Sequence, residues 1–273
     1  MPAKLWHLIQ DRLDASKAAD WKQRIADYRT IEAVQRRERG GRWRDEDVLG
    51  AMVLAVLSNS ADWSRIHAVR PLLPEAFEDY SLKRCAERTE RQVERCLGRL
   101  NELGVSSQTL RRGLRRLTLA ARRLHEWSTT HGSADSYFLS LLDSCQHDPK
   151  QAALALGANG SDYKLPGLGI ALAAETLRNL GYDLSKPDRH VCRAAGAFGL
   201  VAFRRWPNRR GTKAPEANPR ELLDTMMGVE EMARAVGVQA TYLDTAIWIL
   251  CARSGAHLKN ADLEALAAKA QVP

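Results

Sequence analysis

Apolar residues recur along this chain at helical spacing nearly everywhere, and no run alternates in the way that a half-buried strand requires. This pattern predicts an all-α protein. The expected helices cover residues 15–37, 45–57, 62–70, 88–102, 107–127, 134–143, 148–156, 168–180, 189–199, 218–235, 238–253 and 261–270.

Glycine and proline mark the main breaks in this pattern. Gly40-Gly41 separates an N-terminal helical hairpin from the rest, and Asp45 is placed to cap the helix that follows. The proline-rich and basic segment 204–219 reads as a surface loop, because apolar helices resume beyond it. We therefore expect an N-terminal helical extension at 1–44 and a core at 45–273.

Composition changes this picture mainly through charge. The 273 residues are 45% hydrophobic and 27% charged, which is ordinary for a globular protein. The 41 Lys and Arg residues exceed the 33 Asp and Glu residues, and the resulting charge of +8 favours a polyanionic partner. The five cysteines form no CxxC pair, which argues against a disulfide framework or a cysteine-rich zinc site.

Targeting signals are weak in this sequence. The longest apolar stretch, 48–57, is about half of what a bilayer requires, and residues 1–12 lack a signal-peptide core. We expect a soluble, cytoplasmic and nucleoid-associated protein.

A short turn between two predicted helices carries the first candidate chemistry. Leu165-Pro166-Gly167-Leu168-Gly169 forms a tight turn that opens a helix, and its glycines permit positive φ and close approach of a ligand. The free N–H groups at the start of that helix, together with its dipole, make an anion site suited to phosphate.

An aspartate follows one helix later. Asp188 comes directly after Pro187 and begins the next predicted helix. Taken alone, an aspartate at this position is best interpreted as a helix N-cap.

The ordered combination of these motifs is more specific, and it resembles the helix-hairpin-helix (HhH-GPD) DNA glycosylases. This superfamily includes endonuclease III, the adenine glycosylase for A·oxoG mispairs and the alkylbase glycosylases. Its LPGxGxxxA pattern matches residues 165–169 with Ala173, and its D-x-H-V-x-R segment matches 188–191 with Arg193. Upstream and downstream segments at 49–60, 104–125 and 241–251 extend the resemblance over residues 45–253. It implies a two-lobed helical fold, with the hairpin at 164–181 and a catalytic segment at 186–200.

The resemblance implies a reaction as well. Asp188 would be the catalytic carboxylate, stabilising the oxocarbenium character that develops on the sugar when the bond to the base breaks. Many family members attack C1′ with a lysine two residues after the second hairpin glycine, and this chain has Ala171 there. We therefore expect a monofunctional glycosylase that leaves an abasic site, with Lys164 as the nearest lysine. The small Ala171 also suggests room for a large or adducted base.

The resemblance further assigns contacts with double-stranded DNA, to which we expect a monomer to bind. Asn59 is the candidate for filling the gap left by a flipped base, although a helix C-cap role is equally compatible. The remaining candidates for binding DNA are Gly167, Gly169, Lys164, His190 and Arg193. The candidates for the base pocket are Ala171, Trp43, Trp63, Tyr242 and Trp248, although core packing is the commoner role of such aromatic residues.

Two further basic segments could have either a purely structural role or a role in binding nucleic acid. The helix 107–127 carries six arginines that could follow phosphates or simply be solvated. The segment 204–210 mixes arginines with Trp206, which could stack on a nucleotide or dock on the protein.

No cofactor is expected. Iron–sulfur members of the family use four spaced C-terminal cysteines, and only Cys251 lies in that region here. We expect no metal, but a monovalent cation on the hairpin carbonyls, as found in some family hairpins, stays an open option.

Other functions remain compatible with the sequence. The chain could be a non-catalytic DNA-binding protein that keeps the hairpin, or a helical adaptor without a nucleic-acid role. The excised base is also open: alkylated purines, deaminated or mismatched bases, and enzymatically modified bases of phage DNA all fit. The last would indicate defence instead of repair.

Overall fold

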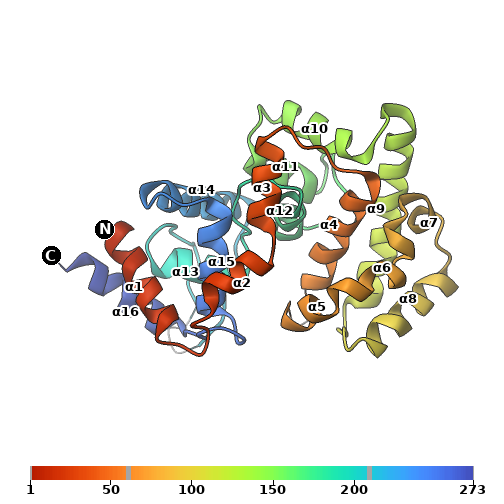
Figure 1. Cartoon of the computed structure of the whole chain (residues 1–273). Helices are drawn as coiled ribbons and strands as arrows, with labels where there is room; N and C mark the ends of the chain where they lie inside the picture. Colours follow the sequence, from red (N-terminus) through yellow and green to blue (C-terminus); the bar gives the residue numbers. More distant parts are fainter. Residues whose placement is uncertain (1, 60–62, 208–210, 273) are drawn as a thin grey trace. The chain divides into compact units, whose positions relative to one another are not determined.

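The computed structural model describes residues 2–59, 63–207 and 211–272, and within these ranges it is helical without strands (Figure 1). The all-α prediction is confirmed. The helices are α1 (Pro2–Asp14), α2 (Trp21–Asp27), α3 (Thr30–Glu38), α4 (Asp45–Ser58), α5 (Trp63–Val69), η1 (Arg70–Leu72), α6 (Leu73–Ala76), η2 (Glu78–Tyr80), α7 (Leu82–Ala86), α8 (Glu90–Glu102), α9 (Leu110–His131), α10 (Ala134–Ser144), α11 (Pro149–Gly157), α12 (Ile170–Asn179), α13 (Arg189–Ala197), α14 (Pro219–Ala235), α15 (Ala240–Cys251) and α16 (Asn260–Gln271). Within the described ranges, every helix is too short or too polar to cross a bilayer.

The chain divides into two compact units that do not follow the expected boundary at residue 44. Unit 1 consists of Met1–Val34 and Gly181–Pro273, and unit 2 is Gln35–Leu180. Residues 1–34 are part of unit 1 because the apolar stripe of α1, formed by Leu5, Ile9 and Leu13, is buried in its core. Residues 35–44 belong to unit 2, so the segment 1–44 is not a separate extension.

The predicted N-terminal helix at 15–37 is also wrong. The chain instead forms α1, which was not predicted, and then two short helices, α2 and α3. Arg29, between α2 and α3, adopts a positive φ of 58°, a conformation that interrupts a right-handed helix.

Unit 1 is built around α15, which is buried along nearly all of its length. Helices α1, α2, α13 and α14 pack against it, and α1 also packs against α16. Figure 1 shows α1 and α16 side by side, which places both chain ends at this unit. Because α13 packs against α14, α15 and α16, these three helices together determine where the start of α13 lies.

Unit 2 is built around α4, whose apolar residues between Val48 and Leu57 are mostly buried. Helices α9, α10 and α12 pack around it, and α11 and α12 form a helical pair. The end of α11 lies so close to the start of α12 that a Cβ added to Gly157 would lie 2.5 Å from Cα of Ile170. A side chain larger than hydrogen cannot be accommodated there without displacing the backbone.

Asp45 does not cap its own helix as expected. Its Oδ1 accepts a hydrogen bond from the backbone N–H of Ala134 at 2.7 Å, at the start of α10. At the start of α4, Asp47 accepts the N–H of Arg44 instead.

Candidate functional site

Asp188 lies at the N-terminus of α13 in unit 1 and is half-buried. Its Oδ1 accepts hydrogen bonds from the backbone N–H groups of His190 (2.8 Å) and Val191 (3.1 Å), which makes it the N-cap. Among the residues that the structure describes, none donates a hydrogen bond to Oδ2. One carboxylate oxygen therefore fixes the orientation of the group and leaves the other for a ligand.

The extended segment before Asp188 is tied to α15. Asp183 accepts the backbone N–H groups of Ala240 and Thr241 at 3.1 and 2.8 Å, and so caps α15. The buried carboxylate of Asp244 accepts hydrogen bonds from Ser185 Oγ and from the backbone N–H of Lys186, both at 2.8 Å. Nothing in the sequence pattern indicated that Asp183 and Ser185 belong to the site.

His190 is neutral at physiological pH. Burial lowers the pKa of its imidazole to about 4, against the opposing effect of the nearby Asp188 carboxylate. Its Nε2 faces the Nε–H of Arg189 at 3.2 Å. Because an arginine N–H can only donate, Nε2 is the acceptor and the proton is on Nδ1. His190 therefore carries no positive charge with which it could attract a DNA phosphate.

The two aromatic candidates on α15 have different surroundings. Trp248 lies edge-on to His190, with ring centroids 6.0 Å apart, and edge-on to Tyr28 at 6.5 Å. Tyr242 instead packs against Trp6 and Trp21 in the core. Trp248 thus lies next to His190 and Tyr28 next to Trp248, while Tyr242 has a packing role.

Arg193 cannot bind DNA as expected, because its side chain is buried. The residue is 0% exposed, and its guanidinium donates hydrogen bonds to Oδ1 of Asn260 and to the carbonyl of Leu258. It ties α13 to the start of α16.

The hairpin turn in unit 2 has the geometry that its sequence predicts at one of its two glycines. Gly167 has φ of +85°, the left-handed region that favours glycine. Gly169 is the N-cap of α12 with φ of −82°, so backbone conformation does not require glycine there. A Cβ at Gly169 would meet no described atom within 4 Å. The N-terminus of α12 is thus open to a ligand.

Lys164 stabilises this turn from within. Its ammonium donates hydrogen bonds to the carbonyls of Gly157 and Leu168, and burial, helped by nearby Arg116, lowers its pKa. Arg123 donates to the carbonyls of Asp162 and Lys164. These four carbonyls already face positive charges of the chain itself, so a monovalent cation on the hairpin would have to use other carbonyls. No group of three or more metal-ligating side chains is found in the described part of the chain.

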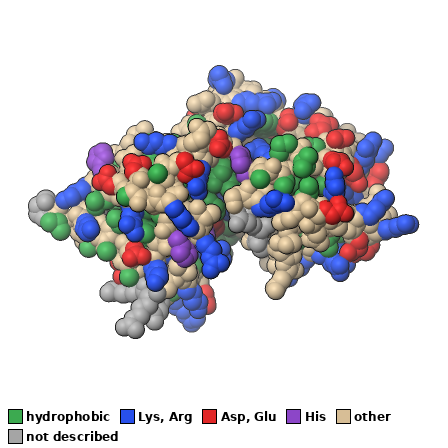
Figure 2. Space-filling view, turned by 60° about the horizontal axis from the view of Figure 1, so that its bottom comes forward, with side chains coloured by type: hydrophobic (Ala, Val, Ile, Leu, Met, Phe, Trp, Pro, Cys, Tyr) green, Lys and Arg blue, Asp and Glu red, His purple; other side chains and the backbone are tan. Residues whose placement is uncertain are grey.

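The arginines of α9 divide into two groups. Arg111 and Arg115 form ion pairs with Glu94 and Glu90 of α8, as in an ordinary solvated helix face. On the face drawn in Figure 2, Lys and Arg side chains are likewise interspersed with Asp and Glu. Arg116 is exposed, and its Cβ lies next to Gly167, so it is a second arginine of α9, besides Arg123, placed beside the turn.

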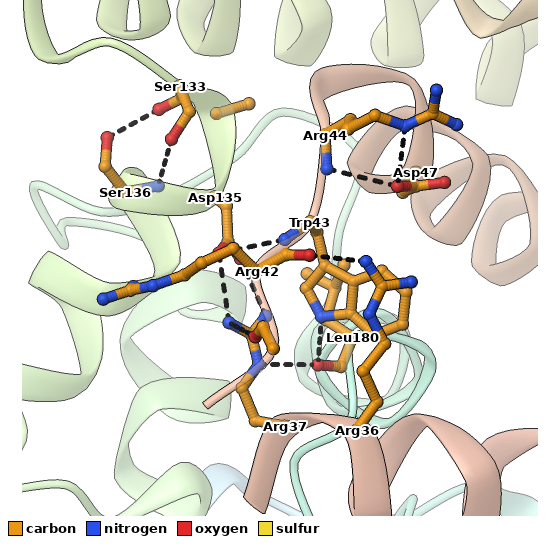
Figure 3. Close-up of polar contacts among 12 residues, drawn as sticks. Arg36, Arg37, Arg42, Trp43, Arg44, Asp47, Ser133, Asp135, Ser136 and Leu180 are labelled. Carbon is orange, nitrogen blue, oxygen red and sulfur yellow. Dashed lines mark hydrogen bonds and ion pairs between the residues drawn. The ribbon is translucent and has the colours of Figure 1, made fainter. Parts of the chain in front are cut away.

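Trp43, a candidate for the base pocket, is instead held in a polar cluster of unit 2. Its Nε1 donates to the carbonyl of Leu180 at 2.9 Å, and the Arg36 guanidinium lies 4.0 Å from its ring centroid. Figure 3 shows this ring beside Arg36, and the Arg37 guanidinium facing the carboxylate of Asp135. Trp43 thus anchors the segment after α3 to the end of α12 within unit 2.

The other candidates are placed as follows. Asn59 is exposed at the C-cap of α4, and Ser60 of the same motif lies outside the described residues. Ala171, the second residue of α12, and Trp63, the first residue of α5, are half-buried in unit 2. Trp206 docks on α13 against Gly196 and donates to Glu264, as expected if this residue packs on the protein and does not stack on a nucleotide. Residues 208–210 of the same loop lie outside the described ranges.

Comparison with known proteins supports the fold. No family model and no curated protein matches the sequence. The 8-oxoguanine glycosylase/lyase of Methanocaldococcus jannaschii, solved in complex with a 15mer DNA containing 8-oxoguanine, is similar with a TM-score of 0.56 and 19% identity, over 92% of this chain and 98% of that chain. The 8-oxoguanine DNA glycosylase of Thermotoga maritima is similar with a TM-score of 0.55 and 19% identity, over 90% and 96%. Over most of its length, the chain therefore has the helical fold of these glycosylases.

Proposed function

We propose that this protein is a DNA glycosylase that hydrolyses the N-glycosidic bond of a damaged or modified base. The observation that carries the proposal is the geometry of Asp188, one oxygen of which is committed to two backbone amides while the other has no donor among the described residues. A carboxylate held in this way can stabilise positive charge on the deoxyribose as the base departs, and can orient the attacking water.

The hairpin supports DNA as the substrate. The open N-terminus of α12, the exposed backbone at Gly169 and Arg116 next to Gly167 together suit a phosphate of the DNA strand. The similar protein from Methanocaldococcus jannaschii was solved with DNA.

We propose that the product is an abasic site and an intact strand. The position that carries a nucleophilic lysine in bifunctional members of the resembled family is Ala171 here, and Lys164 is occupied with carbonyls of the hairpin. In this respect the protein would differ from the Methanocaldococcus jannaschii protein, which is named a glycosylase/lyase.

The first substrate to test is 8-oxoguanine, the base named for both similar proteins. Alkylated, deaminated and phage-type modified bases complete the panel. Wild-type protein and Asp188→Asn are incubated with duplexes that each carry one such base, and freed bases are identified by mass spectrometry. Strand cleavage is scored on gels with and without alkali.

We expect base release by the wild type, strand breaks only after alkali, and a rate at least about 100-fold lower for Asp188→Asn. The amide oxygen of Asn still caps α13, so this variant isolates the charge. Asn218→Ala removes the cap of α14 in the same unit and controls for lost stability. Cleavage without alkali would contradict the monofunctional assignment.

A second candidate follows from the N-cap role of Asp188, since a cap needs no chemistry. A non-catalytic DNA-binding protein would release no base from any duplex, and Asp188→Asn would bind DNA as the wild type does.

A further inference from the structure

A buried carboxylate on α15 holds the segment that leads to Asp188. Asp244 is 1% exposed, and its Oδ1 accepts both the hydroxyl of Ser185 and the backbone N–H of Lys186 at 2.8 Å. Ser185 itself is 0% exposed. The bond from Ser185 is therefore shielded from water and the bond from Lys186 partly so, which makes their loss costly.

The connection continues to Asp188 through the backbone. The N–H of Asp188 donates to the carbonyl of Lys186 at 2.7 Å, so Asp244 and Asp188 both contact Lys186, Asp244 through its N–H and Asp188 through its carbonyl. Asp183 and Thr241 attach only the beginning of the segment, at residues 183 and 184. Asp244 is thus the attachment point nearest to Asp188 on the approach side.

Stability alone does not explain a carboxylate at this position. Residue 244 lies on the most apolar helix of unit 1, where a packed hydrophobic side chain would avoid the desolvation of a charge. What the carboxylate adds is two directed hydrogen bonds to a segment that has no regular secondary structure to fix it.

We propose that Asp244, acting through Ser185 and the Lys186 amide, is the positioning residue that sets the location of the Asp188 carboxylate. This inference rests on the proposed glycosylase function. Without Asp244, the segment 184–187 would relax and Asp188 would shift relative to the sugar. A displacement of about 1 Å can reduce a rate by about 100-fold without altering substrate binding.

The test compares Asp244→Ala, Asp244→Asn, Ser185→Ala and the wild type. The single-turnover rate of base release is measured on the base that the wild type excises best. Affinity is measured separately, on a duplex with a tetrahydrofuran abasic-site analogue. Thr225→Val is the matched control, because it removes a buried hydroxyl that donates to the Glu221 carbonyl within α14.

We expect Asp244→Ala to lower the rate by about 10- to 100-fold, with affinity within about twofold of the wild type. Asp244→Asn keeps an acceptor oxygen at the same reach and should restore most of the rate. Ser185→Ala, a milder change, should lower the rate by about threefold to tenfold even if Asp244→Ala fails to fold. Thr225→Val should retain the wild-type rate.

Each contrary outcome has a distinct meaning. An active wild type whose Ser185→Ala and Asp244 variants keep the wild-type rate overturns this inference alone. Equal losses in rate and affinity, or a loss that Asp244→Asn does not restore, overturn it as well. A wild type that releases no base from any duplex overturns the proposed function and this inference with it.

Discussion

At the scale of single residues, the main feature is an uncharged histidine beside an acidic group. Burial lowers the pKa of His190 to about 4, although Asp188 opposes this shift. At neutral pH, His190 therefore does not neutralise the carboxylate next to it. The negative charge that the proposed chemistry needs is left without a cationic partner from this ring.

The low pKa of His190 makes stability depend on pH. An unfolded chain protonates this histidine near its ordinary value of 6.5, whereas the folded protein resists protonation until about pH 4. The free energy of unfolding should therefore be greatest above pH 6.5 and fall between pH 6.5 and 4, by up to about 3 kcal/mol. Urea unfolding at intervals across this range measures it.

The control is His190→Phe, which keeps a ring beside Trp248 and cannot titrate. Its stability should fall less steeply than that of the wild type over the same interval, since only other groups contribute. Parallel curves for the two proteins would show that the histidine is protonated equally in both states.

The sequence placed Asp188 at a helix start because those signals are local, a preceding proline and the start of an apolar period, whereas its catalytic role was implied only by the resemblance to a family. It could not reveal Asp244 and Ser185 as partners, because they are 59 positions apart and only the packing of α15 brings them together. Arg193 was wrongly assigned because a sequence records a charge but not its burial. The sequence likewise does not show that the ammonium of Lys164 turns inward, to the carbonyls of Gly157 and Leu168.

At the scale of elements, the decisive contact is between the two helices of the hairpin. Periodicity predicted both helices and their connecting turn, because each carries a clear apolar stripe. It could not predict how closely they approach, which Gly157 permits. Short elements such as α6 and α7 were not predicted, since four or five residues are too few for a helical period.

Gly157→Ala tests this close approach. The added Cβ would lie 2.5 Å from Cα of Ile170, so the helices must separate, and we expect a loss of about 1–3 kcal/mol in the free energy of unfolding. DNA affinity should fall with it, because the turn at 164–169 would move. Urea unfolding and titration with a fluorescent duplex measure the two effects.

Gly98→Ala is the matched control. Gly98 lies within α8, where an added Cβ would meet no described atom within 4 Å. Alanine is the better helix former, so this variant should gain up to about 1 kcal/mol. Similar stabilities for the two variants would contradict a tight approach at Gly157.

At the scale of the whole molecule, each unit depends on residues that the sequence does not place together. Unit 1 combines both ends of the chain, and the segment after α3 is fastened to unit 2 by polar contacts. Arg37 pairs with the 1% exposed Asp135 at 2.7 Å and also donates to the carbonyl of Leu180. Nothing in the local sequence predicts such pairings across about a hundred positions, which is why the boundary at residue 44 was wrong.

Asp135→Ala should be strongly destabilising. It leaves the largely buried Arg37 guanidinium without its carboxylate partner, and breaking such a pair costs about 3–5 kcal/mol. Glu102→Ala removes an exposed carboxylate paired with Arg99 and should cost less than about 1 kcal/mol. Thermal and urea unfolding of both variants provide the comparison, and a similarly small effect at Asp135 would show that the pair is not buried in solution.

The inward-turned ammonium of Lys164 has a consequence for the conditions in which the protein can work. The occupancy of these carbonyls by a free alkali ion would depend on the salt concentration. The ammonium of Lys164 is covalently attached and therefore stays at a high effective concentration. The hairpin should keep its shape whether sodium or potassium dominates its surroundings, and through osmotic stress that changes both.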